Sequence, residues 1–175
     1  MTSQDTLAES ILSSRDLLLR FLVGFDDDNR TRQTADMPNH VAWTLGHCAL
    51  TMHRAAEHFD GRSLPEGEFI TSDGTAGDAR CFDTESVCFG STPVDAPQQY
   101  PTLQRAREIF ESACARLAAG AGSAGDAKLA EMVPWATGEI PLRTLVLRLA
   151  FHNGTHTGQL IDLRRALGLG RVIVP

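Results

Sequence analysis

Residues 142–167, with the sequence LRTLVLRLAFHNGTHTGQLIDLRRAL, have the pattern of one long helix. Apolar residues return every three or four positions, which is the spacing of one face of an α-helix. This apolar stripe contains Leu142, Leu145, Leu149, Leu163 and Ala166. Three polar residues, His152, His156 and Gln159, occupy successive positions of the same stripe. The pattern predicts a helix buried along one face, with a polar site set into that face.

The two histidines of this stripe have the spacing of metal ligands. Residues i and i+4 lie one above the other on a helix, so the imidazoles of His152 and His156 can bind one ion. Histidine is the commonest metal ligand among side chains. Burying polar groups without partners costs roughly 1–3 kcal/mol each. We therefore expect this run of polar groups to bind a ligand.

A second strongly apolar helix is expected from Val41 to Phe59, after Pro38, with Asn39 as its N-cap. This helix carries His47. A lone histidine on an apolar face is more often a core residue with one hydrogen bond. Together with the pair, however, three neutral imidazoles could hold a metal and leave coordination positions open. The other histidines of the stretch are expected on the surface: His40, His53 and His58.

Two further helices complete the expected fold. One runs from about Asp5 to Gly24, and another runs from Thr102 to a stop at Gly120 and Gly122. A short helical segment is expected from Asp126 to Met132. No segment shows the sustained alternation of a strand. Four long helices in 175 residues predict an all-α four-helix bundle, with residues 1–175 as a single domain.

The connection from Gly61 to Tyr100 is rich in Gly, Ser, Thr, Asp and Pro. A loop of this length is uncommon in a compact domain unless it is functional. It is long enough to run the length of a bundle, so we expect a crossover between the second and third long helices. It could also form the rim of a substrate pocket.

Composition and charge exclude several classes of protein. The formal net charge is −6 and no cluster of Lys and Arg is present, so we expect no nucleic-acid binding. No apolar run approaches the ~20 residues of a membrane span. The polar start, Met1 to Ser10, differs from a signal or transit peptide, so we expect a cytoplasmic protein. The four cysteines fit no zinc ribbon or redox motif and are expected to be free thiols.

The histidine pair does not predict a peptidase. Metallopeptidases of the H-E-x-x-H type need a glutamate after the first histidine as general base. Asn153 stands at that position and cannot accept a proton. On the other side of the same helix, Ala150, Gly154 and Gly158 form a track of small residues that would let a helix of this chain, or of a second subunit, approach closely.

Two stretches of the sequence together resemble a known family. Asn39-His40-Val41-Ala42-Trp43-Thr44-Leu45-Gly46-His47 resembles the N-x-x-x-W-x-x-x-H block of the DinB-like superfamily. His152-x-x-x-His156-Thr157-Gly158-Gln159-Leu160 resembles its H-x-x-x-H-x-G-Q signature. The order of the blocks and their helical setting agree with the family from the first helix to Gly168.

The resemblance implies a four-helix bundle with a long crossover and a divalent metal held by His47, His152 and His156. Homodimers are frequent in the family, so it also implies a homodimer. Around these ligands we expect Gln159, Asn153 and Trp43, and Gln159 could orient an imidazole or bind a ligand. Characterised relatives include thiol-dependent S-transferases and isomerases that use bacillithiol or mycothiol, and proteins described as metal-dependent hydrolases. Relatives often carry an acidic residue where this chain has Asn153, which weakens a mechanism with a base there.

The favoured hypothesis is a metal-dependent enzyme that acts on a small molecule, either as a thiol-dependent S-transferase or as a hydrolase. The ion would lower the pKa of a bound thiol or water. Three imidazoles accept nickel, zinc, iron or cobalt, and a low-molecular-weight thiol would be the cosubstrate. The alternative is a non-catalytic metal- or ligand-binding protein of a stress response. A third hypothesis, an interaction module with a vestigial site, conflicts with the retention of all three histidines.

Overall fold

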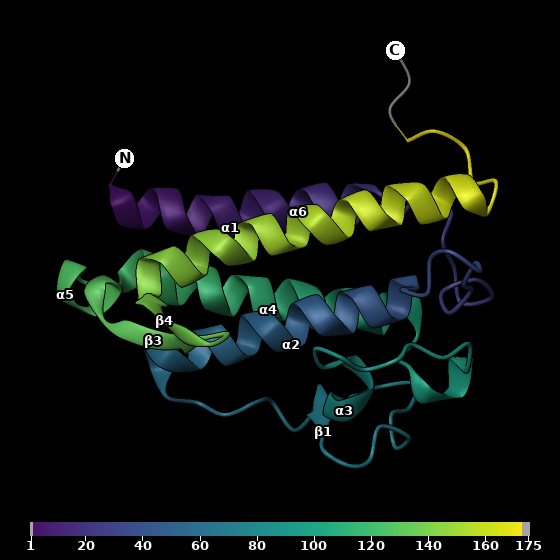
Figure 1. Cartoon of the computed structure of the whole chain (residues 1–175), viewed down its shortest axis with the longest axis horizontal. Helices are drawn as coiled ribbons and strands as arrows, with labels where there is room; N and C mark the ends of the chain where they lie inside the picture. Colours follow the sequence, from purple (N-terminus) through teal and green to yellow (C-terminus); the bar gives the residue numbers. More distant parts are fainter. Residues whose placement is uncertain (1, 173–175) are drawn as a thin grey trace.

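The computed structural model describes residues 2–172 (Figure 1). The chain is mostly helical, and its long helices are α1 (Ser3–Arg20), α2 (Val41–Asp60), α4 (Leu103–Ser123) and α6 (Leu142–Ala166). Helix α1 packs against α4 and α6, and α2 packs against the same two helices. The hydrophobic core therefore lies between these four helices, which run side by side in Figure 1. None of the helices between residues 2 and 172 combines the length and the apolar character needed to cross a bilayer.

The start of α2 differs from the expectation. The N-cap is His40 and not Asn39, because Nδ1 of His40 accepts a hydrogen bond from the backbone N–H of Trp43 at 3.1 Å. The Nε2 atom of His40 lies 3.1 Å from the carbonyl oxygen of Val94. His40 is fully buried, so its expected surface position is wrong. Asn39 instead contacts α6, where its side-chain amide donates to Gln159 at 3.3 Å.

Two helix ends also differ from the expectation. Helix α1 ends at Arg20, before Gly24, and α4 continues past Gly120 to Ser123. Gly120 is a packing residue and not a stop, because a Cβ atom at this position would lie 2.8 Å from Cβ of Phe59 on α2. The glycine thus allows α4 to approach α2 closely.

Two small sheets that the sequence does not predict accompany the helices. In the first, β1 (Phe69–Ile70) pairs in parallel with β2 (Phe82–Asp83). In the second, β3 (Met132–Trp135) and β4 (Gly138–Pro141) form an antiparallel hairpin directly before α6. These strands are too short for a period-two pattern to be visible. Residues 2–172 also form three short helices: α3 (Thr84–Val87), η1 (Pro97–Gln99) and α5 (Asp126–Ala130).

The connection between α2 and α4 is held by buried polar groups. His53 on α2 is buried, contrary to the expectation of a surface residue, and its Nε2 lies 2.7 Å from a carboxylate oxygen of Glu68. Its Nδ1 lies 3.1 Å from the guanidinium of Arg116 on α4. Further along, the buried carboxylate of Asp83 accepts hydrogen bonds from the backbone N–H groups of Gly74, Ala76 and Glu85. The connection is therefore an ordered layer over α2.

The cysteines are all free thiols, as expected. Cys48 and Cys114 are fully buried, and burial raises the pKa of Cys114 to about 12. Because the thiolate is the reactive form, neither buried thiol is suited to nucleophilic chemistry at neutral pH.

Candidate metal centre

Three histidines from two helices meet in one place. His47 comes from α2, and His152 and His156 come from α6. Nε2 of His152 lies 3.0 Å from Nε2 of His47 and 3.2 Å from Nε2 of His156. The three potential ligand atoms all lie within 4.8 Å of one another. The fold thus brings together the three residues that the sequence pattern selected as metal ligands.

Hydrogen bonds at the far side of two rings determine which nitrogen faces the centre. Nδ1 of His47 lies 2.9 Å from the carbonyl oxygen of Val87, which can only accept, so Nδ1 carries the proton. Nδ1 of His156 donates in the same way to the amide oxygen of Gln159 at 2.8 Å. A neutral imidazole has one proton, so Nε2 of each ring presents a lone pair to the centre.

This donor set fits a metal ion. Ring nitrogens bound to zinc at about 2.0–2.1 Å in a tetrahedron stand roughly 3.3 Å apart, close to the spacings observed around His152. Two lone pairs facing each other at such distances repel unless a cation or a proton lies between them. Nδ1 of His152 is buried and has no hydrogen-bond partner among residues 2–172. This ring therefore lacks the orienting contact that His47 and His156 have.

The environment keeps the three rings neutral. Burial, followed by the neighbouring rings of His156 and His47, lowers the pKa of His152 to about 3. Burial and His47 lower the pKa of His156 to about 4. Burial also lowers the pKa of His47, against the opposing effect of the Val87 carbonyl. All three imidazoles are thus unprotonated at pH 7, which is the form that binds metals.

Two of the three residues expected around the ligands contact them. Besides Gln159, the indole of Trp43 stacks on His47 at 4.5 Å between ring centroids and meets the edge of His156 at 5.8 Å. Asn153 faces the other way: it is buried, and its side-chain amide donates to Ser14 of α1 at 3.0 Å. One residue along a helix is a turn of about 100°, which carries Asn153 away from the face that holds His152.

A pocket of about 490 Å³ opens beside the centre. His47 and His152 line one end of it, whereas His156 is not among its lining residues. Its walls come from α2, from α6 and from the tip of the β3–β4 hairpin at Pro134, Trp135 and Ala136. Ala136 has a φ of 52°, a left-handed conformation that is strained for a residue with a side chain. The volume is in the range of small-molecule sites.

Sequence reasoning did not identify several residues that build this site. The Val87 carbonyl is a backbone group, which no residue type reveals. Ser91 accepts a hydrogen bond from Nε1 of Trp43 at 2.8 Å and lies in the long connection, where no periodicity predicts its position. Trp135 and Arg54 line the pocket, and only their residue types, a large aromatic and a cation, could have drawn attention to them.

Comparisons with known proteins agree with this architecture. The crystal structure of a conserved protein from Enterococcus faecalis matches the fold with a TM-score of 0.72, over 94% of this chain and 96% of that chain, at 14% sequence identity. Among curated proteins, none matches the sequence. The family model of the DinB superfamily matches residues 11–160, which include all three histidines. The chain therefore belongs to the DinB superfamily.

Proposed function

We propose that the protein is a metal-dependent enzyme that acts on a small molecule. In this proposal the four long helices form a four-helix bundle, and the connection between α2 and α4 is its crossover. The observation that carries the proposal is the convergence of three neutral imidazoles, two with their outer nitrogen already bonded, at the end of a pocket. Such a set leaves coordination positions for a substrate.

A divalent ion held by these histidines would supply a Lewis acid that lowers the pKa of a thiol or a water molecule. The residues of the chain define where that group would enter. His47 and His152 face the pocket, so a ligand would approach the centre between them. Trp43 covers His47 and His156, which holds the rings in place.

The lining of the pocket favours thiol-dependent transfer over hydrolysis. Hydrolysis needs a general base within reach of the attacking water. No Asp or Glu is among the residues that line this pocket, and Asn153 points toward α1, so His58 is the one lining side chain outside the metal centre that could act as a base. A bound thiolate and a bound hydroxide would both be nucleophiles, but the apolar walls formed by Trp135, Leu145 and Leu149 suit an organic thiol better than water. We therefore propose a low-molecular-weight thiol as cosubstrate and nickel, zinc, iron or cobalt as the ion.

We also propose that the protein is a cytoplasmic homodimer that uses the exposed face of α6. A Cβ atom at Gly154 or at Gly158 would meet nothing within 4 Å, so no described part of the same chain covers the track of small residues. Phe151 is 74% exposed and Leu147 is 41% exposed on the same helix. A second copy of the chain would cover this apolar surface. Analytical ultracentrifugation of the parent and a Phe151→Asp variant tests this, and a monomeric parent contradicts it.

The test of the metal centre is metal content by plasma mass spectrometry. We expect one equivalent of a divalent ion in the parent protein and loss of that ion in a His152→Ala/His156→Ala variant that keeps its helical circular dichroism. A parent that remains free of metal after reconstitution contradicts the proposal. The alternative, a non-catalytic binding protein, predicts a metal without an exchangeable coordination position. A rise in melting temperature with a physiological thiol, seen only in the metal-loaded parent, would favour the enzyme.

A further inference from the structure

The pocket beside the histidines is also lined by a cationic side chain, Arg54. Thr51, Arg54 and His58 continue along the face of α2 that begins with His47, and all four residues line the pocket. Arg54 follows His47 by seven positions, which is about 10 Å along the helix axis at 1.5 Å per residue. A ligand that reached both residues would therefore need to be extended and of moderate length.

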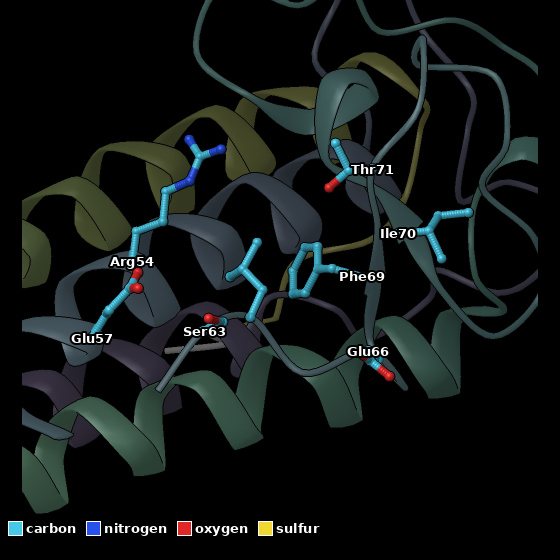
Figure 2. A pocket seen from close by; sticks show the side chains of 8 residues that line it. Arg54, Glu57, Ser63, Glu66, Phe69, Ile70 and Thr71 are labelled. Atoms are coloured by element: carbon cyan, nitrogen blue, oxygen red, sulfur yellow. The ribbon is translucent and has the colours of Figure 1, made fainter. Parts of the chain in front are cut away.

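The guanidinium of Arg54 is available to such a ligand. Among residues 2–172, no carboxylate lies within ion-pair distance of it, although Glu57 stands one turn further along the helix. Figure 2 shows Arg54 at the border of a neighbouring pocket that Glu57 and Glu66 also line. In this view its side chain extends away from the Glu57 carboxylate and toward α6. Arg54 also lines the pocket that His47 and His152 line, so the cation borders the same cavity as the candidate metal centre.

The charge of the pocket is opposite to that of the protein. The chain carries a formal net charge of −6, yet no acidic residue lines this pocket. Glu57 and Glu66 line the neighbouring pocket and not this one, so on this side the guanidinium of Arg54 attracts anions. A guanidinium binds a carboxylate with two parallel hydrogen bonds. The imidazole of His58, one turn beyond Arg54, can donate another hydrogen bond to the same group.

The rest of the pocket is apolar. Leu145 and Leu149 of α6 form one wall, and Trp135 of the hairpin forms part of another. Phe89 also lines the pocket, and its side chain is 94% exposed. A ligand with an apolar body would cover these surfaces and gain roughly 25 cal/mol for each Å² removed from water.

We propose that the substrate bound here is a small carboxylate with an aromatic or aliphatic body. Its carboxylate binds Arg54, its body lies between Trp135 and the leucines of α6, and its other end reaches His47 and His152. The identity of the group at that end rests on the proposed metal-dependent function. The carboxylate anchor does not, because none of the hydrogen bonds of the three histidines within residues 2–172 involves Arg54.

Calorimetry with a series of matched probes tests the anchor. The probes are the four carboxylates from 3-phenylpropionate to 6-phenylhexanoate, and each is paired with the alcohol of the same chain length. The protein is measured after EDTA treatment and again after metal loading. We expect at least one carboxylate to bind about tenfold more tightly than its alcohol in both forms, the order expected for one charge-assisted pair. Arg54→Gln should abolish this preference, and Arg54→Lys should retain part of it.

The matched control is Arg148→Gln, because Arg148 is exposed in the middle of α6 and does not line the pocket. Its affinities should stay within twofold of the parent. If no carboxylate binds more tightly than its alcohol, or if Arg54→Gln keeps the preference, the anchor is wrong. If the parent protein cannot be loaded with metal but still prefers carboxylates to alcohols, the anchor stands and only the proposed metal-dependent function is contradicted.

Discussion

The amide oxygen of Gln159 lies 2.8 Å from Nδ1 of His156, one turn along the same helix, and accepts a hydrogen bond from it. The same oxygen receives a second hydrogen bond from the side chain of Asn39 at 3.3 Å. Asn39 precedes α2, the helix that carries His47. This pair of contacts therefore links the start of α2 to the orientation of the His156 imidazole on α6. An outer contact of this kind fixes both the tautomer and the direction of the ring.

We expect Gln159→Leu to lower metal affinity about 10- to 100-fold, as is usual when the outer partner of a ligating histidine is removed. Gln159→Glu keeps an oxygen acceptor and should retain the affinity of the parent. Competition with a chromophoric chelator measures both constants. Equal affinities for the leucine variant and the parent would show that the contact does not orient His156.

A second prediction concerns pH and the buried cap of α2. Burial lowers the pKa of His40 to about 4 from 6.5, while the backbone of Val94, the charge of Asp95 and the backbone of Arg30 oppose the shift and the charge of Arg30 adds to it. The unfolded chain therefore takes up this proton first as the pH falls. Stability from this residue is fully present above pH 6.5 and is lost between about pH 6.5 and pH 4, by about 3 kcal/mol in total.

The measurement is urea unfolding of metal-free parent and His40→Asn proteins at pH 7.5, 5.5 and 4.5. Asparagine can cap the helix but does not titrate. The other buried histidines contribute equally to both proteins, so the difference between the two pH profiles isolates His40. The parent should lose more stability on acidification than the variant, and parallel profiles would refute the assignment.

A third prediction concerns His53, which joins α2 to Glu68 of the connection and to Arg116 of α4. His53→Leu removes both contacts and leaves two charged groups without this partner in a partly buried place. We expect a loss of about 2–3 kcal/mol in the free energy of unfolding. His58→Leu on the same helix changes a half-exposed residue and should stay within about 0.5 kcal/mol. Similar losses in the two variants would contradict a structural role for the His53 contacts.

Opposite effects are expected from the same substitution at two glycines. Gly120→Ala places a methyl group 2.8 Å from Phe59, so it should destabilise the protein by about 1–3 kcal/mol. At Gly158 the new methyl group meets nothing within 4 Å, and helix propensity should stabilise the monomer by up to about 1 kcal/mol. Thermal unfolding of both variants below the concentration at which the protein associates is the measurement. A stabilising Gly120→Ala would mean that α4 and α2 are not in close contact there.

The helices and the clustering of the three histidines could be predicted from the sequence for a physical reason. A repeat every three or four residues is a local property, and His152 and His156 interrupt it at positions that can only share one face. His47 is predicted to join them because it lies on a strongly apolar helix and because the residues around it resemble a block of a known family. These features need no knowledge of how the helices are arranged.

The remaining features depend on contacts between distant parts of the chain. His40 and His53 are polar residues that we expect on the surface, but contacts from the connection cover both of them, and Arg116 of α4 also contacts His53. Asn153 lies beside a ligand in the sequence but bonds to α1, because its direction is set by helix rotation. Gly120 is predicted to end a helix because glycine is common at helix ends. In the fold it lies inside α4, where the side chain of Phe59 packs against it.

The hydrogen bond between His47 and the Val87 carbonyl has an evolutionary consequence. A main-chain oxygen is present whatever amino acid stands at that position, and although the Val87 side chain is part of the core, exposed side chains of the connection such as Phe89 can change while this oxygen still holds the imidazole. Mutations in this layer could alter the rim that a ligand first meets without disturbing the three nitrogens beneath it. A change at the rim and a change at the three histidines are in this way separately heritable.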